Sequence, residues 1–262
     1  MRLDDRFFEV PRASRQTSEG PVDLPILYYD VTNVIALFDA PLGGVRAVLE
    51  GTDLEPAIVV RGRAVLALSF YEYRRTTVGV YNEVGTAIFV VRRGERPPRL
   101  GWADLLVPPR RRTIAAYVVD LPVTTAVANA AGREIWGYPK FVTRIPFRAL
   151  GREIDCGVDD PAGGARIVTL AGRLGPGAPA PSLDLMMYTL LDGALIRTHV
   201  DVRGPVTAHA PGSVRLTVGA SSHRMAENLR TLGLVSARPL FVMRTDRFQS
   251  ILHEGDRIPR LR

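Results

Sequence analysis

The sequence predicts a mainly β (α+β) protein, in which one antiparallel sheet forms a barrel or a sandwich and carries a few short helices. Two observations predict this class. Runs of β-branched and aromatic residues recur along the chain and are separated by turn signals. Helical patterns are few and short, and no internal repeat or break in composition divides the 262 residues. We therefore expect a single domain over residues 1–262.

In the N-terminal half, predicted strands surround one short helix. Residues 1–25 are rich in Pro, Ser and Thr and are expected to form an extended arm. Residues 41–49 begin with proline and place apolar residues on one side, a pattern typical of a short helix. Residues 81–85, Tyr-Asn-Glu-Val-Gly, have the composition of a β-turn. Strands are expected at 26–38, 57–60, 64–73 and 86–92.

Residues 93–112 are predicted to form an unusually long loop. Its ends are basic and rich in proline, whereas Trp102 and Leu105 in its middle are apolar. Loops of this length are often functional, so we expect a lid or an interface, or else an excursion packed on its own surface.

The C-terminal half contains two predicted helices. Thr124 or Thr125 can cap a helix that ends at Gly137, with Pro139 as a stop signal. The second helix is expected at 224–232. Strands are expected at 114–121, 141–145, 153–158, 165–172, 184–190, 194–202, 213–219 and 238–244.

Composition excludes several classes of function. The net charge is +7, but the arginines are dispersed and no nucleic-acid-binding motif is present, so we expect no nucleic-acid partner. No apolar run is long enough for a membrane helix, and no signal peptide is recognisable, so a cytoplasmic protein without membrane contact is expected. Cys156 is expected to be structural. The spacing of the histidines predicts no metal site.

Lys140 is the single lysine among 34 basic residues. Arginine can replace lysine at most surface positions, so one retained lysine indicates a position where arginine does not serve. Arginine stays protonated at any usable pH, whereas a desolvated lysine can lose its proton and attack a carbonyl group. Lys140 is therefore the candidate nucleophile.

The residues around Lys140 favour this interpretation. Pro139 has a fixed φ and is expected to place Lys140 at the start of a strand on a stiff support. Trp136, Tyr138 and Phe141 are expected to surround the amine with apolar surface. Desolvation disfavours a charged ammonium group.

The stretch from Gly132 to Lys140 resembles the active-site motif of the acetoacetate decarboxylase family, in which Gly-Arg-Glu, an aromatic or small pair and then Tyr-Pro-Lys carry the Schiff-base lysine. Residues 79–83, Gly-Val-Tyr-Asn-Glu, resemble the family stretch with an active-site glutamate. Residues 221–223 and 238–244 resemble its C-terminal end. The resemblance implies a β-barrel-like fold with a buried central site, a homo-oligomer, and imine chemistry without metal or organic cofactor.

The resemblance also implies roles for individual residues. Lys140 would form the Schiff base with a keto acid, and Glu83 would position the substrate or move a proton. Glu83 could instead be a polar residue of a β-turn. The expected substrate-binding residues are Phe141, Tyr138, Trp136 and Arg133, and a structural role at the helix end is the alternative for Arg133.

The sequence departs from the family pattern beside the nucleophile. Family decarboxylases carry a second lysine directly after the first, and Phe141 stands there in this chain. Arg133, Arg74 and Arg75 are candidates to supply the missing cation. Leu68 occupies the position of another family acid, and no arginine lies between residues 21 and 41 to match the family's substrate-binding arginine.

Three functions follow as hypotheses. The first is decarboxylation of a β-keto acid through an imine. The second is a Schiff-base aldolase or dehydratase acting on a 2-oxo acid, which the Phe141 departure favours. The third is a non-catalytic protein that binds a carbonyl compound, or a protein partner through residues 93–112.

Overall fold

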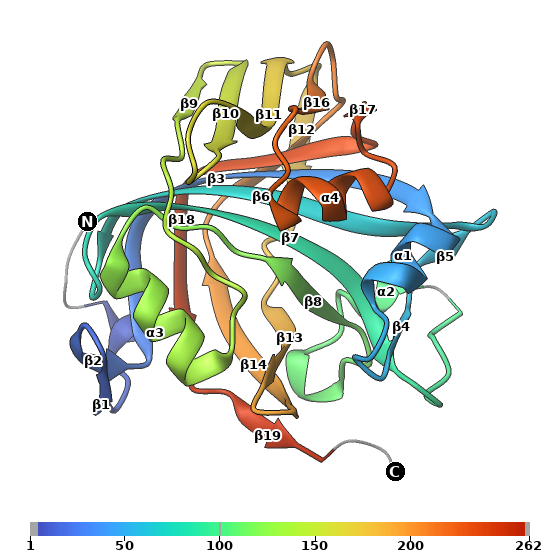
Figure 1. Ribbon diagram of the computed structural model, residues 1–262. Helices are drawn as coiled ribbons and strands as arrows, with labels where there is room; N and C mark the ends of the chain where they lie inside the picture. The colour runs from blue at the N-terminus through green and yellow to red at the C-terminus, as the bar shows by residue number, and fades with distance from the viewer. Residues whose placement is uncertain (1–4, 100, 260–262) are drawn as a thin grey trace.

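A closed barrel of seven strands forms the centre of the computed structural model, which describes residues 5–99 and 101–259 (Figure 1). The strands run in the order β18, β3, β6, β7, β8, β13, β14, and pairing of β14 with β18 closes the ring. The β8–β13 pair is parallel, and the other pairs in the ring are antiparallel. The barrel strands are β3 (Ile26–Pro41), β6 (Arg63–Thr76), β7 (Tyr81–Arg92), β8 (Ala115–Asp120), β13 (Leu185–Leu191), β14 (Ala194–Arg203) and β18 (Phe241–Leu252).

Shorter strands extend this sheet at its edges. They are β4 (Leu54–Pro56), β5 (Val59–Val60), β12 (Gly177–Ala180), β15 (Val206–His209) and β19 (Asp256–Ile258). Because successive side chains on a strand point to opposite faces, every second residue of β6 and β7 faces the barrel interior.

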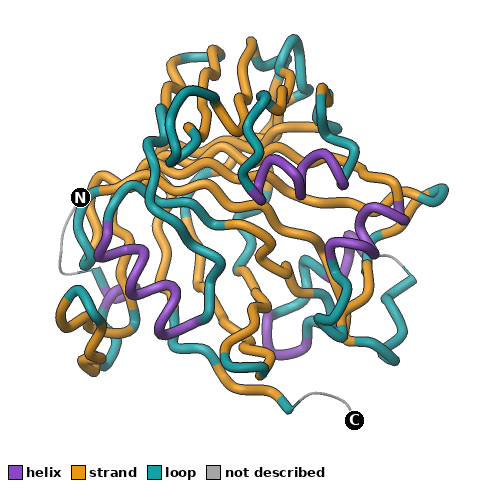
Figure 2. The backbone as a smooth tube through the Cα atoms, in the orientation of Figure 1, coloured by secondary structure: helices purple, strands orange, loops and turns teal. Residues whose placement is uncertain are grey.

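A second sheet of five strands packs outside the barrel, at the top of Figure 1. Helices α1 and α4 contact each other, and their buried residues join both sheets in one large apolar core. Figure 2 shows how little of the chain is helical. The additional elements are β9 (Phe147–Leu150), β10 (Glu153–Asp159), β11 (Arg166–Arg173), β16 (Arg215–Val218), β17 (Ser236–Ala237), α1 (Leu42–Val48) and α4 (Arg224–Thr231).

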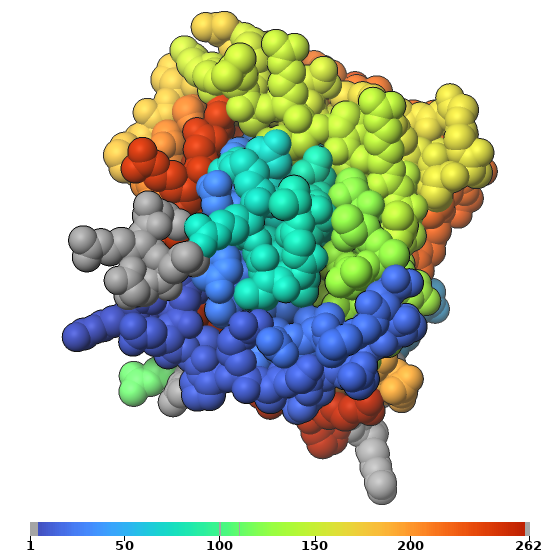
Figure 3. Space-filling model, turned by 90° about the vertical axis from the view of Figure 1, so that its left-hand side faces the viewer, coloured from blue at the N-terminus to red at the C-terminus, as the bar shows by residue number. Residues whose placement is uncertain are grey.

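Helix α3 (Ala126–Trp136) and an N-terminal hairpin lie together at one side of the barrel. The hairpin consists of β1 (Ala13–Thr17) and β2 (Gly20–Leu24). The Ser18 backbone N–H donates to the carboxylate of Glu134 on α3 at 3.0 Å. Figure 3 views this side and shows the hairpin in dark blue next to α3 in green.

The structure confirms the mainly β, barrel-like class and corrects several local predictions. The described part of the predicted N-terminal arm forms η1 (Arg6–Phe8) and the β1–β2 hairpin, and residues 1–4 lie outside the described part. Residues 81–85 belong to strand β7 and are not a turn, because they pair in register with residues 69–73 of β6. Residues 141–145 form one isolated bridge in place of a strand.

Other predicted elements are confirmed with small changes. Helix α3 begins after Thr125, whose side chain accepts a hydrogen bond from the Ala128 backbone N–H, and ends at Gly137 with φ of 68°. The long loop carries α2 (Gly101–Asp104) and η2 (Pro109–Arg111). Cys156 is buried, and burial raises the pKa of its thiol to about 12. None of the helices in residues 5–99 and 101–259 is long and apolar enough to span a membrane.

The buried carboxylate of Asp120, at the end of β8, attaches α4 to the barrel. It accepts hydrogen bonds from the Asn228 side chain at 3.0 and 3.2 Å, and the Arg224 guanidinium lies 3.5 Å away. Burial raises the pKa of Asp120 to about 6, above the value of about 3.9 for an unfolded aspartate. The folded state therefore binds this proton more tightly than the unfolded state.

We predict that Asp120 makes stability fall as the pH rises from about 4 to 7. The pKa shift corresponds to a loss of roughly 2 to 3 kcal/mol. Urea unfolding of the wild-type protein and of Asp120→Asn, at about pH 4 and at about pH 7, measures this change in the free energy of unfolding. The Asn variant, which keeps an oxygen acceptor for Asn228, should lack this part of the pH dependence. Parallel pH profiles for the two proteins would contradict the prediction.

Candidate active site

Lys140 lies in an extended segment that follows α3 and runs beside residues 121–123. The backbone N–H of Leu121 donates to the carbonyl of Pro139 at 3.2 Å, and the N–H of Val123 donates to that of Phe141 at 2.9 Å. Val123 also forms an antiparallel bridge with Glu83 on β7. The segment at 121–123 therefore lies between Lys140 and Glu83 and fixes their relative position.

Lys140 and Glu83 form a buried ion pair. The Lys140 Nζ atom lies 2.6 Å from Glu83 Oε2, and the two residues are 6% and 7% exposed. The hydroxyl of Tyr73 donates a hydrogen bond to the other carboxylate oxygen, Oε1, at 3.1 Å. Separating charges in such a buried place is costly, so each partner holds the other in position. The carboxylate is also placed to accept a proton from the amine.

Buried tyrosines surround this pair. The Lys140 Nζ atom lies 5.8 Å from the ring centroid of Tyr138 and 5.9 Å from that of Tyr81. The Tyr81 hydroxyl lies 3.2 Å from that of Tyr28. Burial is the largest cause that raises the pKa of Tyr28, Tyr73, Tyr81 and Tyr138. These phenols therefore stay protonated at neutral pH and can donate hydrogen bonds.

The pair faces a cavity of about 310 Å³ inside the barrel. Lys140, Glu83 and Tyr138 line it together with residues from the barrel strands and from the 93–112 loop. The side chain of Arg112 lies at the loop end, where its N–H groups donate to the backbone carbonyls of Val107 and Asp184. Most of the remaining lining is aliphatic or aromatic.

Of the four predicted substrate-binding residues, the structure brings one to the cavity and leaves three outside its lining. Tyr138 lines the cavity, whereas Trp136, Phe141 and Arg133 are not part of its lining. Trp136 is buried behind Tyr138 and donates its indole N–H to the carbonyl of His253 at 2.9 Å. Phe141 points to the opposite side from Lys140, with its ring centroid 4.2 Å from that of His223. The expected apolar enclosure by all three aromatic residues is therefore wrong for two of them.

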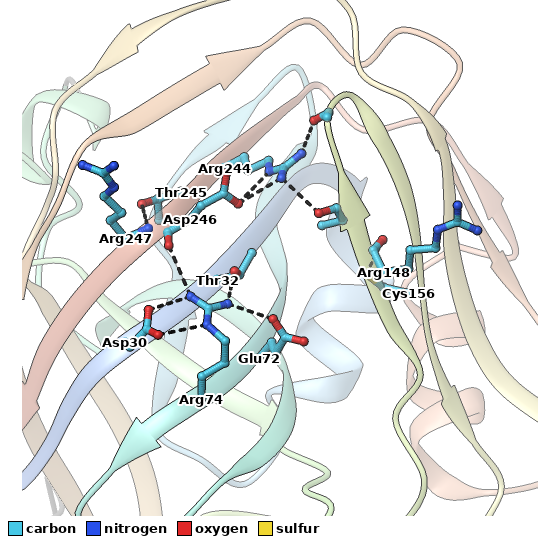
Figure 4. A network of polar contacts seen from close by, with 12 residues as sticks. Asp30, Thr32, Glu72, Arg74, Arg148, Cys156, Arg244, Thr245, Asp246 and Arg247 are labelled. Atoms are coloured by element: carbon cyan, nitrogen blue, oxygen red, sulfur yellow. Dashed lines mark hydrogen bonds and ion pairs between the residues drawn. The ribbon is translucent and has the colours of Figure 1, made fainter.

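The arginines considered as replacements for the family's second lysine do not reach the amine. Arg133 donates to the backbone carbonyl of Lys140 at 3.0 Å, a contact that supports the segment. Arg74 lies on the outer face of β6 and pairs with Asp30 at 2.7 Å and Glu72 at 2.8 Å (Figure 4). The Arg75 guanidinium lies 5.2 Å from the centroid of the outward Tyr29 ring.

Sequence reasoning missed most of the site. Tyr28, Tyr73 and Tyr81 come from three separate strands, and only the alternation of β6 and β7 could have shown that two of them face inward. Tyr81 and Glu83 stand two residues apart and share a face. The turn-like composition of residues 81–85 hides this signal in the sequence.

A second polar cluster lies on the outer face of β14. The His253 Nε2 and His199 Nε2 atoms lie 2.6 and 3.3 Å from the carboxylate of Asp201. The candidate ligand atoms of these three residues lie within 4.8 Å of one another, so the fold brings together a set that the histidine spacing did not predict. The alternate residues Val200 and Val202 line the cavity, so the cluster points away from the barrel interior.

Comparison with solved structures shows the same fold throughout. Acetoacetate decarboxylase from Legionella pneumophila is 16% identical, with 96% of this chain and 92% of that chain covered and a TM-score of 0.64. The enduracididine biosynthesis enzyme MppR, complexed with the condensation product of pyruvate and imidazole 4-carboxaldehyde, is 14% identical over 89% and 88%, with a TM-score of 0.58. An acetoacetate decarboxylase-like enzyme from Sphingomonas wittichii is 14% identical over 92% and 95%, with a TM-score of 0.60.

The family assignment rests on the sequence. No curated protein matches the chain. The family model described as acetoacetate decarboxylase matches residues 9–220, which include both Glu83 and Lys140. The chain therefore belongs to the acetoacetate decarboxylase family.

Proposed function

We propose that the protein is a Schiff-base lyase that decarboxylates a β-keto acid through an imine on Lys140. The buried pair of Lys140 and Glu83, with Nζ and Oε2 2.6 Å apart, carries this proposal. An amine attacks a carbonyl group only as the free base, and a carboxylate at this distance can accept the proton that the ammonium group releases.

In the proposed reaction, these groups act in sequence. The neutral amine of Lys140 adds to the keto carbon, and loss of water gives a protonated imine. The bond to the carboxylate carbon then breaks, carbon dioxide leaves, and the electron pair moves to the imine nitrogen to give an enamine. The enamine takes a proton on carbon, and water hydrolyses the imine to release the ketone. In this proposal Glu83 holds and returns the proton at Nζ, to which its carboxylate is hydrogen-bonded.

The apolar lining of the cavity favours loss of carbon dioxide. A substrate carboxylate is poorly solvated among aliphatic side chains, and its negative charge disperses as the carbon–carbon bond breaks. The aliphatic lining includes Val118, Leu121 and Leu252. The buried phenols can donate to the departing water and to the enamine.

An aldolase or dehydratase reaction on a 2-oxo acid is the second candidate. It is favoured by the absence of a second lysine after Lys140, where Phe141 points away from the cavity. It is also consistent with the fold shared with MppR, whose structure holds a condensation product of pyruvate. Release of carbon dioxide from acetoacetate, or from a longer β-keto acid, separates the two reactions.

We predict that borohydride reduction traps a keto acid on Lys140. Intact-mass spectrometry after reduction with acetoacetate and with pyruvate should show one adduct. Lys140→Arg should show none, because a guanidinium group stays protonated. The N-terminal amine is the remaining primary amine of the chain, and it is present in both proteins. Equal adducts on the two proteins, or no adduct with any keto acid, would contradict the proposed function, and the second outcome would indicate a carbonyl-binding protein without imine chemistry.

Gly132 on α3 provides the space for the lysine side chain. A Cβ atom at this position would lie 2.3 Å from Lys140 Cε and 2.5 Å from Cδ, far inside van der Waals contact. Alanine is otherwise favoured over glycine in a helix interior by about 1 kcal/mol. The glycine therefore serves the neighbouring side chain and not the helix.

We predict that Gly132→Ala displaces the Lys140 amine from Glu83 and slows imine trapping at least about tenfold, because misplacement by an ångström has effects of this size or larger. The melting temperature should also fall, because the displaced amine leaves the buried Glu83 carboxylate less well paired, and this cost exceeds the gain in helix propensity. Gly43→Ala on α1, where a Cβ atom meets no atom of the described residues within 4 Å, is the matched control. Trapping at the wild-type rate in Gly132→Ala would show that the lysine does not need this space.

A further inference from the structure

The barrel interior contains a path of small side chains that leads away from Glu83. On β6 and β7, the interior positions beyond Glu83 pair Ser69 with Gly85 and then Ala67 with Ala87. All four residues line the cavity. We call these four residues the small-residue lane. Side chains this small leave the centre of the barrel hollow, where larger residues would fill it.

The neighbouring strands give the lane apolar walls. Ile35 pairs with Ser69 across the β3–β6 ladder, and Leu37 pairs with Ala67. Met243 of β18 pairs in turn with Ile35. All three apolar side chains line the cavity, so a group that lies in the lane contacts hydrocarbon on several sides.

Aromatic residues surround the far end of the lane. Phe89 of β7 lies 6.4 Å from Trp102 of α2, measured between ring centroids, and Trp102 lies 6.2 Å from Phe241 of β18. All three line the cavity, and Trp102 is 41% exposed. This end therefore reaches the protein surface beneath the 93–112 loop.

The dimensions exceed those that a four-carbon acid needs. Glu83 and Phe89 are six residues apart on β7, which corresponds to about 20 Å at the rise of a strand. The cavity volume of about 310 Å³ has room for about ten water-sized groups. A small substrate bound at Lys140 would leave most of this apolar space without a partner.

We infer that the substrate is a carbonyl compound with an extended, unbranched apolar chain, such as a straight-chain β-keto acid. Its carbonyl carbon lies at Lys140, and its chain follows the small-residue lane toward Trp102. This inference rests on the proposed function, because it places the carbonyl group at the imine-forming amine. Each methylene group buried in the lane should raise affinity about fourfold.

A series of methyl ketones, which are the decarboxylation products of such acids, tests the inference. Acetone, methyl propyl ketone and methyl hexyl ketone are incubated with the protein, reduced with borohydride and measured by intact mass. The half-saturating concentration should fall about fourfold for each added methylene. A flat series, or exclusion of methyl hexyl ketone, would overturn the inference.

Filling the lane provides the sharper test. Ala87→Leu should lower the preference for methyl hexyl ketone over acetone at least about tenfold, because the added carbons occupy the path of the chain. Ala178→Leu, an exposed position on β12 outside the cavity, should keep the wild-type preference. Trp102→Ala removes the ring between Phe89 and Phe241 at the far end, and it should also lower the preference. An unchanged preference in both cavity variants would overturn the inference.

Binding without imine formation separates this inference from the proposed function. Lys140→Ala, titrated with the same ketones and followed by calorimetry, should still bind methyl hexyl ketone more tightly than acetone. If this preference holds but no ketone is trapped on the wild-type protein, the apolar chain binds in the small-residue lane but Lys140 forms no imine. If acetone is trapped but chain length has no effect in either protein, Lys140 forms an imine but the small-residue lane does not bind the chain.

Discussion

The buried contact between Lys140 and Glu83 is the interaction on which the rest of the site depends. Two charges that are 6% and 7% exposed persist inside a protein only if each is held against the other. Glu83 is fixed by its place on a barrel strand and by Tyr73, and Lys140 by the bonds of Pro139 and Phe141 to residues 121–123. The barrel therefore acts as a rigid support for one amine.

The two ends of the cavity have different chemistry, and the same strands create both. Toward α3, the interior positions carry Glu83 and protonated tyrosines, which can move and donate protons. Toward the 93–112 loop, the same strands carry the small-residue lane, and aromatic residues follow. An imine site at one end and an apolar path at the other suit a substrate with a reactive head and an inert chain. Gly132 contributes from outside the barrel by leaving room for the lysine.

The sequence predicted what depends on local signals and missed what depends on register. Helix α3 was predictable because Thr125 caps it and Gly137 ends it, and Lys140 was identifiable as the single lysine of the chain. Predicting that Phe141 points away from the amine requires knowing that the segment around Lys140 is extended, so that neighbouring side chains point to opposite sides. Predicting the small-residue lane requires the register of β6 and β7, in which Ala67 pairs with Ala87. The homo-oligomer and the cytoplasmic location stay predictions.

The most direct measurement of the central claim uses the single lysine. Protein labelled with nitrogen-15 at the lysine side chain should give one side-chain amine signal in a nuclear magnetic resonance spectrum, that of Lys140. Addition of a keto acid or a long-chain methyl ketone should move this signal to the range of a protonated imine. The ketone that forms on decarboxylation of a keto acid, such as acetone from acetoacetate, should give the same imine when it is added directly. A signal that stays in the amine range with every carbonyl compound, while the compounds bind, would contradict the assignment of Lys140 as the nucleophile.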